Sequence, residues 1–344
     1  MISLFGMGRL RSRRIVLAVT IIAILSLVGF SAGCAKKKEK FPSKAVTFIV
    51  PMSPGGGVDT MSRGIASYVQ KYLGQPLVVE NVPGPGSVNA IAQVMKAPKD
   101  GYTIMAVTTP IMISIHLYEK QMALAKPFME SWKPIFAFLT GDGNGLAVRK
   151  GTFKDINALV AEAKKRTLKV GGATGFGSSD HATLLQFADA YGGSYDYIPH
   201  GGGGEAMASL LGGKIDALMI SLSGDAVDLS RVDILGVSIA DRFEGYPNIP
   251  TFKELGHPEL TLNWAVGAYA PPDVPDDVVK TLETAFDKAF HDPDFQKWAK
   301  QAKKPIGTGW NAKQWGDFLK GYEASALKIL PKMQAEMQKA QSGK

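Results

Sequence analysis

The feature of this sequence with the clearest chemical potential is a glycine-rich loop near the start of the folded part of the chain. An apolar run that ends at Val50 is typical of a buried strand, and it leads into Ser53-Pro-Gly-Gly-Gly-Val-Asp59 and then into a helical pattern. Because glycines lack side chains, their backbone N–H groups can approach a ligand closely, and the start of the following helix carries partial positive charge. The loop therefore predicts an oxyanion-binding site. The alternative is a tight strand-to-helix turn that merely needs positive φ angles.

A second segment repeats this order of strand, glycine loop and helix start. It is Gly172-Ala-Thr-Gly-Phe-Gly-Ser-Ser-Asp-His181, which follows the predicted strand Lys169–Gly172. Neither this segment nor Pro51–Asp59 contains lysine or arginine, and the nearest basic residue in the first case, Arg63, lies one helical turn inside its helix. An anion at either segment is therefore expected to be held by backbone N–H groups and a helix N-terminus rather than by a basic side chain.

An enzymatic interpretation has to be weighed, because Ser178, Ser179, Asp180, His181 and His200 include the residue types of a hydrolase triad. Adjacent residues rarely point at one another, however, and the chain has neither a Gly-x-Ser-x-Gly elbow nor the Gly-Lys-Ser/Thr ending of a nucleotide-binding loop. The five histidines also lack the spacing of metal ligands. The sequence thus predicts a protein that is not an enzyme and has no cofactor and no metal site.

The net charge of +8 over 344 residues is concentrated at the N-terminus. Residues 1–33 hold four arginines and no acidic residue, and Lys36–Lys40 adds further positive charge, which leaves the rest of the chain nearly neutral. A nucleic-acid partner is therefore not expected.

The N-terminal segment itself has the pattern of an export signal, with Arg9–Arg14 followed by the apolar run Ile15–Phe30. It leads to Ser31-Ala-Gly-Cys34, which resembles the lipobox of bacterial lipoproteins, although serine stands where leucine is usual. Cys34 is the only cysteine of the chain, so no disulfide is expected. We predict a lipoprotein signal peptide over residues 1–33, lipidation of Cys34, and a tether over residues 34–43. A retained N-terminal membrane anchor is the alternative.

Beyond the tether, short apolar runs alternate with helical patterns, which predicts βα units on parallel sheets. The pattern breaks near Thr140–Gly145, where a second α/β series begins. From about Asn263 a strand at Trp264–Ala270 precedes amphipathic helices at Val278–His291 and Asn311–Lys339; the last starts with a capping box and contains Pro331, which is expected to kink it. This tail is expected to return to the first lobe. The predicted lobes are 44–140 plus 266–344 for lobe 1 and 141–265 for lobe 2, with hinges near Thr140–Val148 and Asn263–Ala270.

An ordered set of short motifs carries a resemblance to a known family. The motifs are Phe41-Pro-Ser-Lys44, Val50–Asp59, Leu73–Asn81, Pro83–Gly86, Pro98–Thr103, Leu210–Asp216, Ala270–Pro275 and Asp292-Pro293. In this order and spacing, over Phe41–Leu330, the chain resembles the extracytoplasmic substrate-binding receptors of tripartite tricarboxylate transporters, the Bug or TctC receptors.

The resemblance implies a two-lobed, periplasmic-binding-protein-like Venus flytrap fold of the α/β class, in which each lobe is a sheet flanked by helices. It also implies a small carboxylate ligand captured between the lobes, delivery to a two-component membrane permease, and no catalysis. A receptor that presents its ligand to a sensor kinase is the alternative, with a secreted hydrolase less favoured.

The resemblance also assigns site residues. The expected ligand contacts are Ser53, Gly55, Gly56, Gly57, Thr108, Thr109, Thr174, Gly175, Ser178, Ser179 and Ser221. Asp59 is expected to cap its own helix, since a second anion beside a carboxylate would repel it. Thr108 and Thr109 could instead be an ordinary strand terminus, and Ser179 or Asp180 must cap the second helix. His181 is expected to be structural, and the loop at His200 departs from the family pattern.

Overall fold

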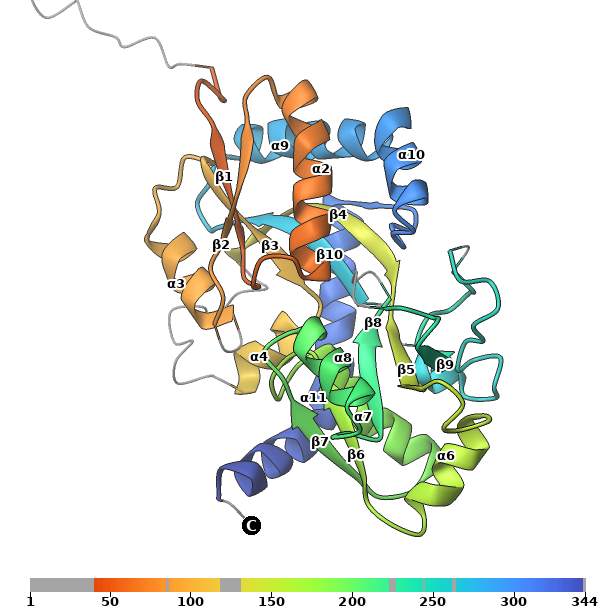
Figure 1. The fold of residues 1–344 in the computed structure, drawn as a ribbon. Coiled ribbons are helices and arrows are strands. Elements are labelled where there is room, and N and C mark those ends of the chain that lie inside the picture. The colour runs from red at the N-terminus through yellow and green to blue at the C-terminus, as the bar shows by residue number, and fades with distance from the viewer. Residues whose placement is uncertain are drawn as a thin grey trace, which may run out of the picture. The chain divides into compact units, whose positions relative to one another are not determined.

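The computed structural model describes residues 40–84, 87–117, 131–222, 227–243, 245–261 and 264–342. The predicted signal peptide and Cys34 lie outside these residues. The chain divides into two units, Met1–Ser43 and Lys44–Lys344, and the second unit contains both β-sheets (Figure 1).

The first sheet has six strands in the order β11-β4-β10-β3-β1-β2. β1 pairs in parallel with β2 and β3, whereas β10 runs antiparallel to β3 and β4, and β11 runs antiparallel to β4. The strands are β1 (Val46–Val50), β2 (Leu77–Asn81), β3 (Thr103–Thr108), β4 (Lys133–Asp142), β10 (Trp264–Ala270) and β11 (Trp310–Asn311). The accompanying helices are α2 (Gly57–Leu73), α3 (Val88–Lys96), α4 (Ile111–Leu117), α9 (Asp276–Phe290) and α10 (Pro293–Gln301).

The second sheet has five strands in the order β7-β6-β8-β5-β9. β6 pairs in parallel with β7 and β8, and β5 runs antiparallel to β8 and β9. The strands are β5 (Asn144–Arg149), β6 (Leu168–Gly172), β7 (Tyr195–Pro199), β8 (Ala217–Ser221) and β9 (Val232–Val237). The helices are α6 (Ile156–Ala163), α7 (Ser179–Tyr191), α8 (Gly203–Leu211) and the short 3₁₀ helix η3 (Pro258–Leu260).

Two sheets flanked by helices confirm the predicted α/β, two-lobed fold, but the expectation of parallel sheets is wrong, because both sheets are mixed. The antiparallel strands β10 and β5 lie where the chain passes between the sheets, and a strand that enters from the other sheet can pair in the opposite direction. The boundaries proposed for the lobes stay a prediction.

Local signals in the sequence explain most of the elements. In α2, Met61, Ile65 and Val69 form the buried face, and the helix ends at Gly74, whose φ of +77° is the left-handed conformation that glycine adopts readily. The capping box predicted for the last helix is confirmed, since Asn311 and Gln314 exchange hydrogen bonds between side chain and backbone. The elements that the sequence did not predict are α4, β4, β5, α6, β9, η3, α10 and β11.

The first passage between the sheets is very short. β4 ends at Asp142 and β5 begins at Asn144, so Gly143 is the single residue between them. A Cβ atom at Gly143 would lie 2.5 Å from the Ile239 Cγ2 atom, so glycine is required there by close packing. The second predicted hinge includes Asn263, which lies outside the described residues, and hinge motion at either passage stays a prediction.

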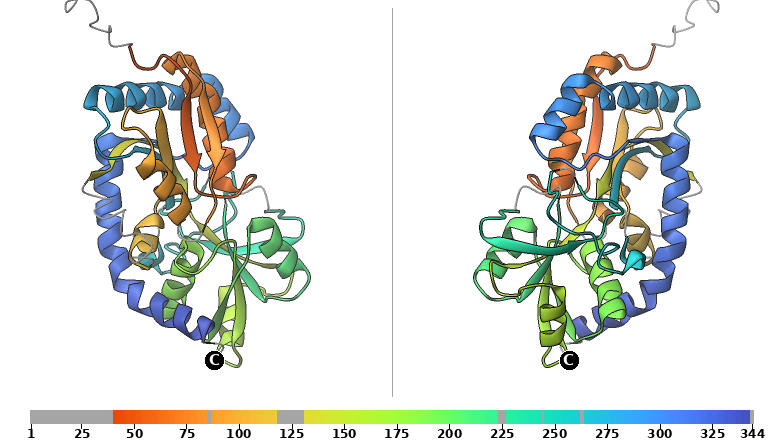
Figure 2. Two further views of the ribbon diagram at one scale, coloured as in Figure 1. Left: turned by 90° about the vertical axis from the view of Figure 1, so that its left-hand side faces the viewer. Right: turned by 90° about the vertical axis from the view of Figure 1, so that its right-hand side faces the viewer.

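The last helix, α11 (Ala312–Gln341), joins both halves of this unit (Figure 2). Its residues Trp315 and Leu319 belong to the core of the first sheet. Farther along, Ile329 and Met333 pack with residues of α7, Ala182 and Leu185, which belong to the second half, and with Ile113 of α4. The expectation that the tail covers the first lobe therefore holds for the start of α11, but its C-terminal part packs on the second half. Pro331 lies inside the helix, and Figure 2 shows that the C-terminal part of the helix is bent.

Among the described residues, no helix combines the length and the hydrophobicity needed to cross a membrane.

Candidate functional site

The first glycine loop lies between β1 and α2, at the carboxyl end of a parallel strand. Ser53, Gly55 and Gly56 are exposed, and Gly57 is the first residue of α2. Gly55 has a φ of +82°, which favours glycine, whereas Gly56 is extended with a φ of −76°. In Figure 1 the N-terminal end of α2 points toward the half of the unit that contains α7 and α8. The first N–H groups of a helix have no carbonyl partner within that helix, so this end can bind an anion.

Asp59, in the first turn of α2, holds this loop in place through its side chain. Its carboxylate is buried and accepts hydrogen bonds from the Gly55 N–H (2.9 Å), the Asn81 amide (2.8 Å) and the Arg63 guanidinium (3.0 Å). Burial alone would raise the pKa of Asp59, but these three donors together hold it below its ordinary value. Asp59 therefore stays ionised, and its charge is neutralised within the loop.

The structure corrects the predicted role of Asp59 as a helix cap. The N-cap position of α2 belongs to Gly56 and has no side-chain cap hydrogen bond, while Asp59 is the third helical residue and reaches back to Gly55. As a result the Gly55 N–H, which was expected to face a ligand, is already engaged. Asn81 was not singled out by the sequence as a site residue, but its amide also donates to the Met52 carbonyl and so fixes the loop at a second point.

The second glycine loop connects β6 to α7. Ser178 takes the N-cap position of α7, and its hydroxyl accepts a hydrogen bond from the His181 N–H at 3.3 Å. The helix is therefore capped by Ser178, rather than by Ser179 or Asp180 as expected. Thr174 and Ser179 are half-buried, and Gly175 is exposed, where an added Cβ atom would meet no atom within 4 Å.

Asp180 is the counterpart of Asp59 in this loop. Its carboxylate accepts hydrogen bonds from the Ala173 N–H (2.8 Å) and from the hydroxyls of Thr174 (3.3 Å) and Ser179 (3.4 Å). Burial raises the pKa of Asp180 to about 6, although each of these hydrogen bonds lowers it. The two hydroxyls predicted to contact a ligand thus also serve to hold the loop.

Tyr197 of β7 supports the same loop and was not anticipated. Its hydroxyl donates to the Thr174 carbonyl at 2.6 Å and lies 3.1 Å from the Ser178 hydroxyl. Burial, together with the nearby Asp180 carboxylate, raises the pKa of Tyr197, so the hydroxyl keeps its proton. A Cβ atom at Gly172 would lie 2.0 Å from the Tyr197 hydroxyl oxygen, which explains the glycine at the end of β6.

A third helix start at the same edge of the second sheet repeats the pattern. The loop after β7 leads into α8, where the Glu205 carboxylate accepts the Gly201 N–H at 2.8 Å. His200 lies beside the end of β6, with its backbone N–H donating to the Gly172 carbonyl at 3.1 Å. No role was predicted for His200, and the structure places it next to the second glycine loop.

The remaining predicted contacts lie at the ends of β3 and β8. Thr108 and Thr109 are both buried, and the Thr109 hydroxyl exchanges hydrogen bonds with the backbone of Ala265 in β10. For Thr109, this arrangement favours a structural role at the end of the strand over contact with a ligand. The Ser221 hydroxyl donates to the buried Asp142 carboxylate at 2.6 Å, beside the passage at Gly143. Ser221 therefore helps to fix the passage between the sheets.

The end of β3 and the second loop are brought together by α4. A Cβ atom at Gly177 would lie 2.3 Å from the Leu117 Cδ1 atom and 4.0 Å from the Ile113 Cγ2 atom. Residues 110 to 117 thus link Thr108 and Thr109 to the loop of the second sheet. That the loops of both sheets contact one ligand stays a prediction.

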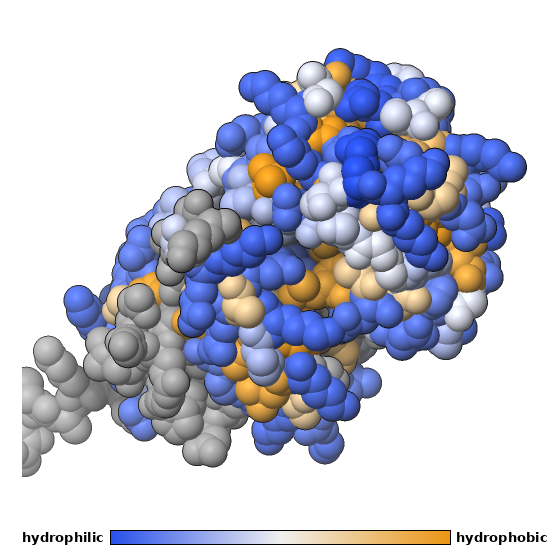
Figure 3. Space-filling model, turned by 90° about the horizontal axis from the view of Figure 1, so that it is seen from below, coloured by the Kyte–Doolittle hydropathy of each residue, from blue (hydrophilic) through white to orange (hydrophobic). Residues whose placement is uncertain are grey.

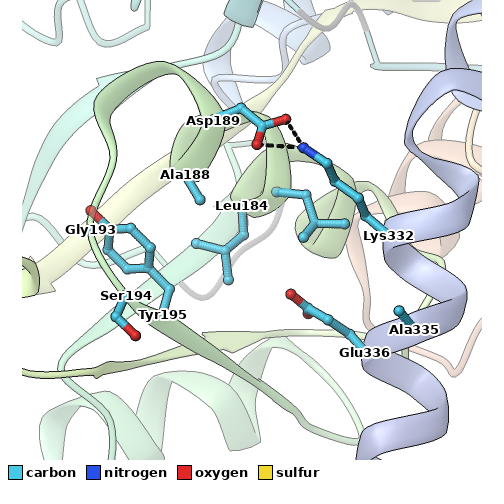
Figure 4. A pocket seen from close by; sticks show the side chains of 10 residues that line it. Leu184, Ala188, Asp189, Gly193, Ser194, Tyr195, Lys332, Ala335 and Glu336 are labelled. Atoms are coloured by element: carbon cyan, nitrogen blue, oxygen red, sulfur yellow. Dashed lines mark hydrogen bonds and ion pairs between the residues drawn. The ribbon is translucent and has the colours of Figure 1, made fainter.

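A cavity of about 460 Å³ lies elsewhere, between α7, α11 and the start of β7 (Figure 4). Its lining includes the apolar side chains of Leu184, Leu185 and Ala335 and the charged side chains of Asp189, Lys332 and Glu336. Seen from below, hydrophobic residues gather in a hollow on an otherwise mainly hydrophilic face (Figure 3). Within the described residues, no group of three or more histidine, cysteine, aspartate or glutamate side chains is arranged to hold a metal ion.

Comparisons with known proteins agree with this architecture. Residues 61–316 match a family described as "Tripartite tricarboxylate transporter family receptor". A UPF0065 protein from the tcbD-tcbE intergenic region of Pseudomonas sp. (strain P51) is 30% identical over 296 residues, which cover 84% of this chain and 85% of that protein.

Solved structures are also similar. One, described as a periplasmic transporter, is 28% identical with a TM-score of 0.77 and covers 85% of this chain and 98% of its own. The periplasmic binding protein BugD is 25% identical with a TM-score of 0.74 and the same coverage.

The raised pKa of Asp180 leads to a prediction about stability. Because its pKa is raised from 3.8 to about 6 on folding, the folded protein binds this proton more tightly than the unfolded chain does. The resulting contribution to stability is present below about pH 4 and is lost as the pH rises through about 6. The free energy of unfolding of the wild type, taken relative to that of Asp180→Asn, should therefore decrease as the pH rises from about 4 to about 6. Urea unfolding of both proteins at each pH measures this difference.

The control is Asp241→Asn, which replaces a carboxylate on a side chain that is 92% exposed. A difference between wild type and Asp180→Asn that stays constant over this pH range would contradict the assignment.

Proposed function

This chain belongs to the tripartite tricarboxylate transporter family of receptors, and we propose that it captures a small carboxylate between its two lobes and delivers it to a two-component membrane permease. The proposal includes closure of the lobes around the ligand at the passages between the sheets. As in other substrate-binding receptors, we expect no turnover of the ligand.

The observation that carries this proposal is the pair of glycine loops, each placed at a parallel strand's carboxyl end and at a helix N-terminus. Gly56, Gly57 and the residues of the first turn of α2 offer backbone N–H groups, and the first turn of α7, which begins at Ser179, offers backbone N–H groups in the same way. Each helix end contributes roughly 0.3–1 kcal/mol to the binding of an exposed anion and up to about 2 kcal/mol when it is partly buried. Shape and backbone geometry should therefore select the ligand more than charge does.

The charged side chains near these loops support a ligand that carries no amine. The carboxylates of Asp59, Asp180 and Glu205 each accept the N–H of their own loop, so they are already engaged. Arg63, the basic residue nearest in sequence to the first loop, donates to Asp59 and, at 2.7 Å, to the Asn81 side chain, so its guanidinium is engaged within the protein.

The hydrogen bonds of His181 and Ser178 disfavour a serine hydrolase. The His181 ring bonds to Gly177 and Glu336, and the Ser178 hydroxyl bonds to Tyr197 and to the His181 backbone. A histidine that serves as a general base has to accept the proton of the serine hydroxyl through a ring nitrogen, and both nitrogens of His181 have other partners.

We further propose that the protein is exported and that Cys34 carries a lipid anchor on the outer face of the cytoplasmic membrane. Membership of the receptor family supports export. The lipid anchor rests on the sequence around Cys34, and residues 34–43 are proposed as a short tether.

A thermal-shift series with citrate, succinate and acetate tests the proposed function. A ligand that binds only the folded state adds about 2.7 kcal/mol of stability at a hundred times its dissociation constant. At least one of these carboxylates should raise the unfolding midpoint, while the uncharged succinamide, which has the shape of succinate, should not. The proposed anion site would be contradicted if none of the three carboxylates raised the midpoint, or if succinamide raised it as much as succinate does.

A second prediction distinguishes binding of the ligand by the glycine loop from binding by the Arg63 side chain. Gly56→Val should abolish binding of the carboxylate identified in that series, because a side chain would block the backbone N–H groups. The fold should tolerate it, since a Cβ atom at Gly56 meets only the Ser53 carbonyl oxygen, at 3.6 Å. Arg63→Gln should weaken binding only slightly, because Arg63 is bound to Asp59 and Asn81.

Both variants are compared by calorimetric titration with Gly321→Val, which makes the same substitution in α11, where an added Cβ atom meets no atom within 4 Å. The reverse order of effects would mean that Arg63 holds the anion and that the glycines only form the turn.

The lipid anchor has its own test. Cys34→Ser should release the mature protein from membranes into the soluble fraction, since no other cysteine is present to be acylated. If the variant still sediments with membranes and retains residues 1–33, the segment is a spanning anchor instead.

A further inference from the structure

His181 connects the second glycine loop to the C-terminal helix. It is the third residue of α7, and its side chain is fully buried. The Gly177 N–H points at the His181 Nδ1 atom, 3.3 Å away. Because a backbone N–H can only donate, Nδ1 must be the acceptor, and the neutral ring carries its proton on Nε2.

The acceptor of that proton comes from the other end of the chain. The His181 Nε2 atom lies 2.9 Å from the Glu336 Oε2 atom of α11. Glu336 is 37% exposed and lines the cavity between α7 and α11, where Figure 4 shows its carboxylate on the α11 side of the cavity. A solvent-accessible carboxylate on α11 thus fixes the tautomer of a buried ring in α7.

The rest of the loop is assembled around the same ring. The rings of Phe176 and Tyr197 lie 5.1 Å and 4.7 Å from that of His181, centre to centre. Tyr197 holds the Thr174 carbonyl, and the His181 backbone N–H donates to Ser178. The position of the His181 ring therefore influences the whole segment Thr174–Ser178.

We propose that Glu336 is a positioning residue for the ligand site, and that it acts by holding His181 in the Nε2–H tautomer so that Nδ1 fixes the Gly177 N–H. This inference rests on the proposed function, in which Thr174–Ser179 faces the ligand. Without the carboxylate, the buried Nε2–H loses its acceptor. The alternative Nδ1–H tautomer then turns a donor toward the Gly177 N–H, and two facing donors repel.

A second contact between the same two helices provides a matched control. Lys332 of α11 donates to both carboxylate oxygens of Asp189 in α7, at 2.6 and 2.5 Å. Lys332→Met removes this ion pair but keeps most of the aliphatic chain. It therefore weakens the docking of α11 without changing the acceptor of the His181 ring.

The experiment compares Glu336→Ala, Glu336→Gln and Lys332→Met in the full-length protein. The ¹⁵N shifts of the His181 ring report its tautomer, and amide hydrogen exchange reports the Gly177 hydrogen bond, both without ligand. In Glu336→Ala the Nε2–H signature should be lost and Gly177 exchange should accelerate on the order of 10-fold. Glu336→Gln should behave like the wild type, because its amide oxygen still accepts a hydrogen bond, and so should Lys332→Met.

Calorimetric titrations with citrate and succinate then measure the effect on binding. Affinity should fall on the order of 10-fold in Glu336→Ala and remain near the wild-type value in the other two variants. Unchanged Gly177 exchange in Glu336→Ala, or an equal change in Lys332→Met, would overturn the inference. If no carboxylate of the thermal-shift series bound the wild type, the proposed function would fail, while the ring shifts and the Gly177 exchange would still decide the role of Glu336.

Discussion

The proposed binding site depends on one electrostatic constraint, which is that an anion must bind beside carboxylates without being repelled by them. Each of three helix starts carries an acidic residue in its first turn, namely Asp59, Asp180 and Glu205. In every case the carboxylate accepts a backbone N–H of the preceding loop. The negative charge is thus used to shape the loop, and Asp59 is further neutralised by Arg63. The N–H groups that these carboxylates do not occupy are the ones available to the proposed ligand.

Much of the fold could be predicted from the sequence because its signals are local. The strand at Val46–Val50, the helix that ends at Gly74 and the capping box at Asn311 depend on apolar periodicity and on residues within a few positions of one another. The direction of β5 and β10 could not be predicted in this way, because it depends on how the chain passes between the sheets. The same limit applies to the second part of α11, whose amphipathic pattern indicates a buried face but not the helix that it contacts.

In the candidate site, too, the local features could be predicted from the sequence and the contacts between distant segments could not. The two glycine loops are visible in the sequence, since strand, glycines and helix start are contiguous. The residues that hold the loops in place are distant in sequence. Asn81 lies 22 residues from Asp59, and Glu336 lies 155 residues from His181. Polar residues of this kind have no spacing by which they could be recognised, and only the folded structure brings them together.

The path of the chain through the two sheets has a consequence for biogenesis. All strands of the second sheet come from one continuous stretch, residues 144 to 237, whereas the first sheet needs β10 and β11 from the last quarter of the chain. β10 separates β4 from β3, so the first sheet cannot form its final strand order until residue 264 and beyond have emerged. During synthesis or secretion, which proceed from the N-terminus, the second half can therefore complete its sheet first. Until then, the edges of β3 and β4 lack their partner strand and are exposed to mispairing, which makes the unfinished first sheet the segment with most to gain from a chaperone.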